Sequence, residues 1–308
     1  MKLLLICFLF GLLAIIRCND EEDWACDPLV PEYCMLPFPN NFWMGDDGHL
    51  ALANTTFPMD KNGKGVDPEA GGWNDLEGFS VFPAITTYWP GLDDLSIENC
   101  PRLWNMDLSM DVTNSPTVLL EAVTGEVVAH WVEVDHSSEL KQKVDTKRAM
   151  LIWPSTSLKY GTRYIVGIKQ TLPDNQGNLI KPSPSFAALR AGRLTRDERI
   201  NSRIHHYEND IFPTLERAGV QREELLLAWD FTTNSKDDIT RKMLSARDDA
   251  RERLGEDGPK YRITEVTTDY NDDIYSRILG DFRMPMYLNT HLPTKDARMV
   301  YSFICSYI

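Results

Sequence analysis

No complete catalytic motif occurs in this chain. A serine nucleophile on a strained strand-to-helix turn requires Gly-x-Ser-x-Gly, because small neighbours let the turn expose the serine. The nearest fragment, GFSVF at residues 78–82, lacks the second glycine. A strand-entry turn in which Ser80 bonds the backbone explains this fragment better. We therefore assign no catalytic residue.

Basic residues are also scarce, with 32 Lys and Arg against 46 Asp and Glu and a net charge of −14. Nucleic-acid binding requires a basic patch that neutralises phosphates. The sequence therefore predicts no nucleic-acid partner. Solubility is a sufficient explanation for most of the acidic charge.

Histidines do not occur at the spacing of a complete zinc site. His205 and His206 precede Asp210 on a predicted helix, and this spacing suits one edge of a metal site. Two ligands do not make a site, so a solvated helix face is the preferred interpretation.

Two acidic segments resemble calcium loops only in part. An EF-hand that began at Asp60 would need an oxygen ligand at Lys64 and a glutamate at Gly71, and both are missing. Residues 269–273 contain three aspartates on a connecting turn, for which exposure to solvent is the simpler explanation. We predict no metal and no cofactor.

Long hydrophobic runs are absent beyond the N-terminus. Residues 3–16 are almost wholly apolar, follow Lys2 and precede an acidic stretch at residues 20–23. This is the pattern of a secretory signal peptide. A membrane anchor is the rival interpretation, but the apolar run is shorter than the roughly 20 residues that a spanning helix needs. We expect a signal peptide at residues 1–18, a secreted, extracellular protein and no transmembrane segment.

Cysteine is scarce, and four residues remain after the predicted cleavage: Cys26, Cys34, Cys100 and Cys305. Four cysteines allow three pairings. We favour a disulfide between Cys26 and Cys34, because the loop between them is short and contains proline, so that it costs little to close. A metal site fits this spacing less well. Cys100 and Cys305 either pair with each other or stay unpaired.

One clear glycosylation sequon is present, at Asn54-Thr55-Thr56. If the source is eukaryotic, we expect the protein to be a glycoprotein with its glycan on Asn54, in an exposed loop.

The chain of 308 residues exceeds a typical single domain, and its pattern changes twice along its length. Residues 19–192 are rich in turns and short strands. They include a predicted hairpin of residues 118–122 and 127–134, and further strands at residues 150–153 and 164–169. Strands at this spacing indicate a β-sandwich.

Residues 193–256 are predicted to be helical around one strand. A capping box at residues 195–198 begins a helix whose apolar residues recur every three to four positions. Gly219 ends this helix, and Pro213 is expected to kink or divide it.

A strand at residues 225–233 separates this helix from a second one, in which Ile239 is expected to face inward. The pattern then returns to strands, and residues 261–268 and 274–288 are predicted to form two of them.

The order of these segments resembles the N-terminal region of secreted bacterial lipases and their relatives, whose first module is the bacterial virulence-factor lipase N-terminal domain. The matching stretches are CDPLVPEYCMLPFPNNFW, WNDLEGFSVFPAITTYWPGLD, SPTVLLEAVTGEVV, YGTRYIVGIKQTLPDNQGNLIKPSPSFAALR, IFPTLERAGVQREELLLAWDFTT and ILGDFRMPMYL. Together they extend over roughly residues 26–290.

The resemblance implies an Ig-like β-rich module at residues 19–192 and a helical connector at residues 193–256. At residues 257–308 it implies the first strands of an incomplete α/β-hydrolase domain, whose Ser-His-Asp triad would follow later. Under this hypothesis the chain is a secreted, non-catalytic N-terminal portion of a lipase- or esterase-like enzyme. Its partner is a C-terminal hydrolase domain, and the full protein hydrolyses a carboxylic ester through an acyl-serine.

The alternative hypothesis is a stand-alone secreted β-sandwich that acts as a binding or adhesion module. It is supported by the number of tryptophans in the β-rich part, because exposed aromatic rings are typical of sugar- and lipid-binding faces. Packing in the core explains most of them without a ligand. These tryptophans are Trp43, Trp73, Trp89, Trp104 and Trp131.

Overall fold

A computed structural model of the chain describes residues 26–57, 65–68, 72–137 and 147–290, together with residues 294, 297 and 299. It consists of two compact units, Met1–Lys236 and Asp237–Ile308. The structure is built mainly of antiparallel β-sheets, with a few helices. The predicted signal peptide, the calcium-like segment at residues 60–64 and Cys305 lie outside the described residues.

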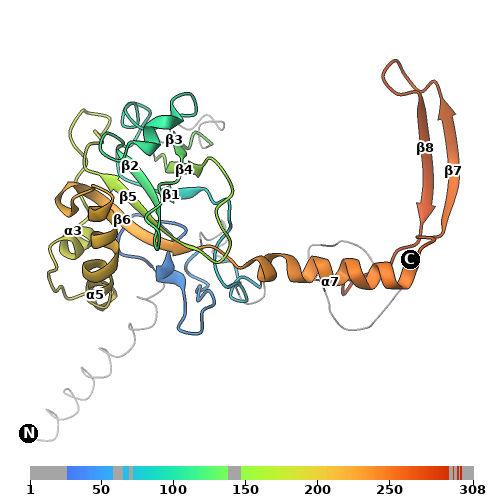
Figure 1. The fold of residues 1–308 in the computed structure, drawn as a ribbon, viewed down its shortest axis with the longest axis horizontal. Helices are drawn as coiled ribbons and strands as arrows, with labels where there is room; N and C mark the ends of the chain where they lie inside the picture. The colour runs from blue at the N-terminus through green and yellow to red at the C-terminus, as the bar shows by residue number, and fades with distance from the viewer. Residues whose placement is uncertain are drawn as a thin grey trace, which may run out of the picture. The chain divides into compact units, whose positions relative to one another are not determined.

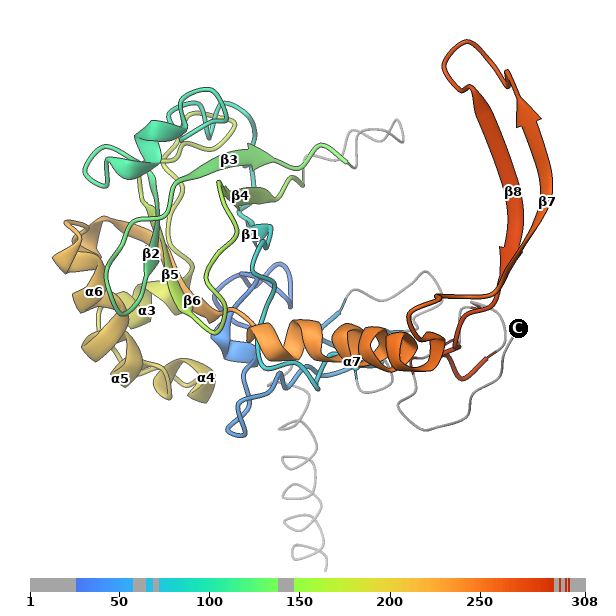
Figure 2. The same ribbon diagram turned by 45° about the vertical axis from the view of Figure 1, so that its right-hand side comes forward.

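The central sheet of the first unit is buried on both faces. It contains β2 (Thr117–Glu121), β5 (Arg163–Lys169) and β6 (Leu225–Thr232), in the order β2-β5-β6 with antiparallel neighbours. Almost every residue of these strands is buried, which explains their near-continuous apolar sequences. Figures 1 and 2 show helices on one side of this sheet and a second sheet on the other.

The second sheet has one face toward the core and one toward solvent. It contains β1 (Ile85–Thr87), β4 (Met150–Pro154) and β3 (His130–Val134), in the order β1-β4-β3. Buried and more exposed positions alternate along each strand, as a half-buried antiparallel sheet requires. Val132 and Ile152 face each other in the register and belong to the same hydrophobic core as the central sheet.

The hairpin predicted for residues 118–122 and 127–134 forms only in part. After a turn in which Gly125 has a positive φ of 71°, Val127 pairs with Leu120 through a single bridge. The chain then leaves the central sheet, and β3 pairs with β4 while β2 pairs with β5. This segment therefore connects the two sheets instead of completing one hairpin.

Short helical segments cover the outer face of the central sheet. Ile200, Tyr207, Ile211 and Leu215 are buried, as their spacing predicts. The segments are α3 (Pro184–Arg190), α4 (Glu198–Asn201), α5 (Ile204–His206), the π-helical η5 (Tyr207–Ile211) and α6 (Phe212–Arg217). Single 3-10 turns occur elsewhere, at η2 (Asn41–Trp43), η3 (Met106–Met110) and η6 (Arg222–Glu224).

Two details of the predicted helix differ in the structure. Its N-cap is Asp197, whose side chain accepts a hydrogen bond from the Arg199 N–H, so the capping box expected at Thr195 does not form. Pro213 lies in the first turn of α6, directly after η5. Proline removes a backbone donor and crowds the preceding turn. The wider π turn at η5 accommodates this change and lets the helical path continue.

The second unit contains most of α7 (Lys236–Leu254) and an antiparallel hairpin of β7 (Tyr261–Thr268) and β8 (Ser276–Phe282). Ile239, expected to face inward, is 42% exposed. In the part of the chain that the structure describes, no helix has the length and apolar character needed to cross a membrane.

The predicted connector at residues 193–256 is divided between the two units. The segments from α4 to β6 belong to the first unit, because β6 supplies the third strand of the central sheet. Most of α7 belongs to the second unit.

Candidate functional site

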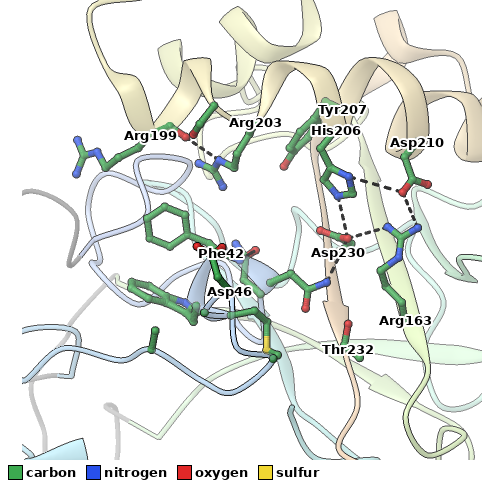
Figure 3. A pocket seen from close by; sticks show the side chains of 18 residues that line it. Phe42, Asp46, Arg163, Arg199, Arg203, His206, Tyr207, Asp210, Asp230 and Thr232 are labelled. Atoms are coloured by element: carbon green, nitrogen blue, oxygen red, sulfur yellow. Dashed lines mark hydrogen bonds and ion pairs between the residues drawn. The ribbon is translucent and has the colours of Figure 1, made fainter. Parts of the chain in front are cut away.

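A cavity of about 820 Å³ opens in the first unit between residues 40–48, the strands β5 and β6, and the helical segments from α4 to η5. Figure 3 shows that its walls come from parts of the chain that are distant in sequence. A cavity where several elements meet, with charged groups in its wall, is the usual setting of a binding site.

Asp230 is the centre of the polar wall. It is the one charged residue of β6, whose sequence is LLLAWDFT, and it is 5% exposed. Its Oδ2 accepts hydrogen bonds from Nη1 of Arg163 at 2.8 Å, from Nε2 of His206 at 3.0 Å and from Nδ2 of Asn41 at 3.2 Å. A buried carboxylate needs such partners to offset the loss of hydration.

Asp210 completes a cluster of four charged groups. Its Oδ2 lies 2.6 Å from Nη2 of Arg163 and 3.6 Å from Nδ1 of His206. The residue belongs to η5 and follows His206 by four positions, so that Asp210 reaches Arg163 and His206 reaches Asp230 on the sheet (Figure 3). When His206 is protonated, the cluster holds two positive and two negative charges.

The charged states of His206 and Asp230 support each other. The hydrogen bond to Asp230 raises the pKa of His206, although partial burial opposes this effect. Burial raises the pKa of Asp230, but the hydrogen bonds and charges of His206 and Arg163 outweigh it and hold this pKa below its ordinary value. His206 and Asp230 therefore favour their ionised forms together.

His206 is not arranged as the base of a Ser-His-Asp triad. In a triad, one ring nitrogen faces a carboxylate and the other faces the nucleophile. Here Nε2 faces Asp230 and Nδ1 faces Asp210. No hydroxyl or thiol of the described residues is hydrogen-bonded to the ring. The geometry supports binding better than nucleophilic catalysis.

The opposite wall is formed by η2 and the residues after it. Asn40 caps η2 by accepting a hydrogen bond from the Phe42 N–H. Phe42 and Met44 are half-buried and line the cavity, and Trp43 is 2% exposed. In Figure 3, Phe42 lies across the cavity from Asp210 and Arg163. This wall therefore presents the apolar side chains of Phe42 and Met44 beside the polar side chains of Asn40, Asn41 and Asp46.

A buried ion pair attaches this wall to the helices. Arg203 donates from Nη1 and Nη2 to the two carboxylate oxygens of Asp27, at 3.2 and 2.8 Å. Asn40 donates to the same carboxylate at 2.6 Å. The guanidinium of Arg203 also lies 4.9 Å from the centre of the Phe42 ring. Because Asp27 is 1% exposed, each charge of the pair depends on the other.

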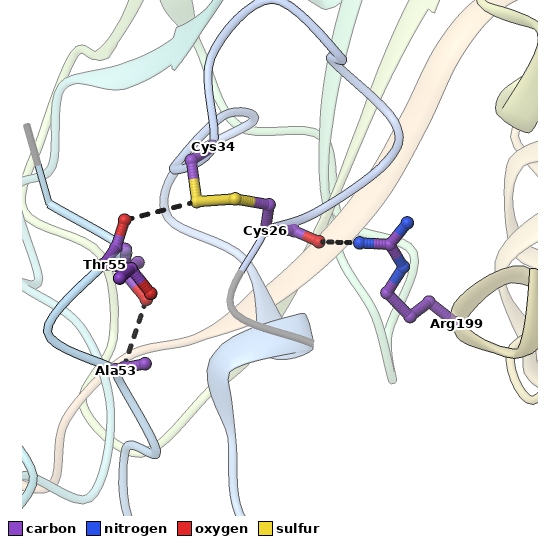
Figure 4. Close-up of a disulfide and its surroundings, with 6 residues drawn as sticks. Cys26, Cys34, Ala53, Thr55 and Arg199 are labelled. Atoms are coloured by element: carbon purple, nitrogen blue, oxygen red, sulfur yellow. Dashed lines mark hydrogen bonds between the residues drawn. A yellow bond between two sulfur atoms is a disulfide. The ribbon is translucent and has the colours of Figure 1, made fainter. Parts of the chain in front are cut away.

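A disulfide joins Cys26 and Cys34 (Figure 4). Asp27 follows Cys26 directly in the chain, so the disulfide restrains it. This disulfide is the pairing favoured from the sequence. The Asp27 N–H donates to the Cys34 carbonyl at 3.1 Å, which closes the loop further. Nη1 of Arg199 on α4 donates to the Cys26 carbonyl at 3.2 Å. The disulfide loop is therefore attached directly to the helical wall of the cavity.

The elbow-like fragment at residues 78–82 begins in the core, where Gly78 and Phe79 are buried, and reaches the surface at Ser80. Ser80 is exposed, and its Oγ accepts a hydrogen bond from the Phe82 N–H at 3.1 Å, as the simpler interpretation predicts. Phe79 forms a bridge with Thr233 at the edge of β6. A Cβ on Gly78 would lie 2.7 Å from the Thr232 carbonyl oxygen, so this glycine is needed for close backbone packing.

The remaining candidate residues form no site among the described residues. Asn54 is exposed in a turn, and its glycosylation stays a prediction. Cys100 is buried and forms no disulfide with a described cysteine, and burial raises the pKa of its thiol to about 12. Within the described ranges, no group of three His, Cys, Asp or Glu side chains could hold a metal ion. This includes the aspartates of residues 269–273.

The tryptophans divide between the core and the surface. Trp43 and Trp89 are buried, whereas Trp73 and Trp104 are 42% and 79% exposed. Trp131 is half-buried on β3. Packing in the core thus explains two of these five residues.

The sequence indicates His206 and Asp210 as a pair but does not indicate their partners on the sheet. A single charged residue in the apolar run LLLAWDF is a signal for Asp230, because a charge at a buried strand position needs a partner. Arg163 begins β5 and carries no comparable local signal. No protein-family model, curated protein or solved structure matches this chain.

Proposed function

We propose that this chain is the secreted, non-catalytic N-terminal portion of a lipase- or esterase-like α/β-hydrolase. In this proposal the two sheets of the first unit are an Ig-like module. The hairpin of the second unit begins the hydrolase sheet, which a further C-terminal domain completes. The order of the sequence segments that resemble secreted bacterial lipases supports the proposal.

The observation that carries the proposal is the exposure of the hairpin β7–β8. Ile278 and Leu279 are neighbours on β8 and point to opposite faces, and they are 61% and 44% exposed. On β7, Ile263 and Val266 are 52% and 57% exposed. A two-stranded hairpin is marginally stable in water by itself. Apolar residues on both of its faces suit a strand pair that lies inside a larger sheet.

The geometry of His206 supports a non-catalytic role for the described residues. Both of its ring nitrogens face carboxylates, and Ser80 bonds the backbone of its own turn. A serine hydrolase needs a nucleophile that is within reach of such a base. The ester-hydrolase chemistry is therefore assigned to the additional domain.

An ester-hydrolysis assay tests this assignment. We expect the purified chain to release no more p-nitrophenol from short-chain p-nitrophenyl esters than its Ser80→Ala and His206→Gln variants. Turnover that persists through further purification, and that a serine-directed phosphonate abolishes, would contradict a non-catalytic chain.

A stand-alone secreted binding module is the second candidate, and the cavity of Figure 3 favours it. The two candidates differ in what happens to the hairpin. If the chain is part of a longer hydrolase, the further domain covers β7 and β8 and protects their amides from hydrogen exchange. If the chain is a stand-alone binding module, the amides of β7 and β8 exchange rapidly in the natural protein. Hydrogen exchange of the protein isolated from its source separates the two.

A further inference from the structure

We propose that the cavity beside Asp230 binds a neutral polyhydroxylated ligand, namely a sugar unit of a mono- or oligosaccharide. This inference does not depend on the hydrolase proposal, because every residue involved belongs to the first unit.

Apart from the exposed Asp46, the charged groups that line the cavity are paired with groups of opposite charge. Arg163 and His206 face Asp210 and Asp230 in a closed cluster. Outside this cluster, each arginine that lines the cavity has its own carboxylate: Arg203 pairs with Asp27, and Arg199 pairs with Asp197.

The compensated charges argue against an ionic ligand. Arg163, Arg199 and Arg203, the arginines of the cavity lining, are each paired with a carboxylate, and Asp210 and Asp230 are each paired with a cation, so these groups are not free for a phosphate or an ammonium group. The exposed carboxylate of Asp46 in the lining further disfavours anions. A ligand without net charge fits such a cavity best.

The polar wall presents donors and acceptors side by side. The side chains of His206, Asp210 and Arg163 are 40%, 34% and 25% exposed, so a ligand can reach their edges. Nη2 of Arg163 and Oδ2 of Asp210 are 2.6 Å apart. A hydroxyl group both donates and accepts hydrogen bonds. Two neighbouring sugar hydroxyls therefore match this pair, one donating to Asp210 and one accepting from Arg163.

The apolar side chains on the wall of residues 40–48 suit the carbon face of a sugar ring. Phe42 and Met44 are half-buried and line the same cavity, with Phe42 across from the polar cluster in Figure 3. Small-molecule sites combine such apolar surfaces with a few polar groups that fix the orientation of the ligand. A volume of about 820 Å³ also lies in the range of such sites and leaves room for more than one ring.

Titration of the full chain by NMR tests the proposal. The probes are neutral mono- and disaccharides, including hexoses and N-acetylhexosamines, with inorganic phosphate and putrescine as charged comparisons. We expect a neutral sugar to shift the backbone amide signals of residues 41–48 and 206–210. We expect phosphate and putrescine to leave them unchanged.

Two substitutions make the test specific. Asp210→Ala should weaken sugar binding at least tenfold, because it removes the acceptor beside Arg163. His205→Ala is the matched control, since His205 is exposed, lies next to His206 and does not line the cavity. Thermal melts establish that both variants are folded. If Asp210→Ala fails to fold, Phe42→Leu takes its place, and it should also weaken sugar binding.

Three results would overturn the inference. The first is that no neutral sugar of the panel binds. The second is that sugar binding is unchanged in Asp210→Ala or Phe42→Leu. The third is that phosphate or putrescine produces the shifts in residues 206–210, which would assign the cavity to a charged ligand.

Discussion

Nε2 of His206 lies 3.0 Å from Oδ2 of Asp230, a carboxylate that is buried within strand β6. This contact joins the helical layer, through His206 at the end of α5, to β6 of the central sheet. Arg163, Asp210 and Asn41 all contact the same pair. The stability of the first unit should therefore depend on the charge of His206.

The first prediction concerns pH. The pKa of His206 is raised in the folded state by its hydrogen bond to Asp230, so the protonated ring stabilises the fold. This contribution is fully present below the unfolded-state pKa of about 6.5, and it is lost as the pH rises through the raised pKa of the folded state. The free energy of unfolding, measured with urea, should fall as the pH rises from the unfolded-state pKa of about 6.5 through the higher folded-state pKa. Above the folded-state pKa it should level off.

A His206→Gln variant serves as the reference for this measurement, because it retains a hydrogen-bond donor but does not titrate. We expect the fall in the free energy of unfolding above about pH 6.5 to be absent in this variant and unchanged in His205→Gln. If wild type and His206→Gln gave parallel curves above pH 6, His206 would not be coupled to folding in this way.

The second prediction concerns the buried ion pair. Asp27→Ala leaves the Arg203 guanidinium buried without its carboxylate, since the Arg203 side chain is 14% exposed. Removing one partner of a buried pair costs about 3–5 kcal/mol. Urea unfolding should show that the free energy of unfolding of Asp27→Ala is lower than that of wild type by this amount. The exposed Asp47→Ala, with a side chain that is 76% exposed, should change stability little. Equal effects of the two substitutions would contradict the structure.

The third prediction concerns the disulfide. Replacing Cys26 and Cys34 by serine together should lower the free energy of unfolding by about 2–3 kcal/mol, as expected for a short closed loop. Dithiothreitol should lower the melting temperature of the wild type and leave that of the double variant unchanged. Peptide mapping without reduction should show the two cysteines linked. A melting temperature of the wild type that is insensitive to the reductant would argue against this pairing.

The fourth prediction concerns the turn at residues 78–82. Gly78→Ala places a Cβ 2.7 Å from the Thr232 carbonyl oxygen and 2.9 Å from the Thr233 carbonyl carbon. Because both neighbours are backbone atoms, the overpacking should cost about 1–3 kcal/mol. Ser80→Ala changes an exposed side chain in the same turn and should stay within about 0.5 kcal/mol of wild type. Thermal or urea unfolding of the two variants measures the difference. If both variants were as stable as wild type, Gly78 would not be needed for packing.

The strands could be predicted from the sequence wherever local pattern determines them. The runs YIVGIK and LLLAWDFT are apolar enough to require burial on both faces, and both are strands of the central sheet. The partners of strands could not be predicted, because pairing depends on contacts between distant residues. The segment after Gly125 illustrates this, since it begins as the partner of β2 and then becomes the partner of β4.

The charged cluster could be predicted only in part for the same reason. His206 and Asp210 are four residues apart on one helical path, so their proximity is a local property. Asp230 and Arg163 reach them only after β5 and β6 have paired in register. The approach of Asp27 to Arg203 depends in addition on the disulfide loop. No pattern in the sequence indicates that Asp230 and Arg163 meet His206 and Asp210, or that Asp27 meets Arg203.

The sequence of the gene beyond the codon of Ile308 tests the proposed function most directly. The proposal predicts an open reading frame that continues into a Gly-x-Ser-x-Gly segment, followed by an aspartate and a histidine that complete a triad. A verified stop codon immediately after Ile308 would contradict it and would leave the stand-alone binding module as the function to pursue.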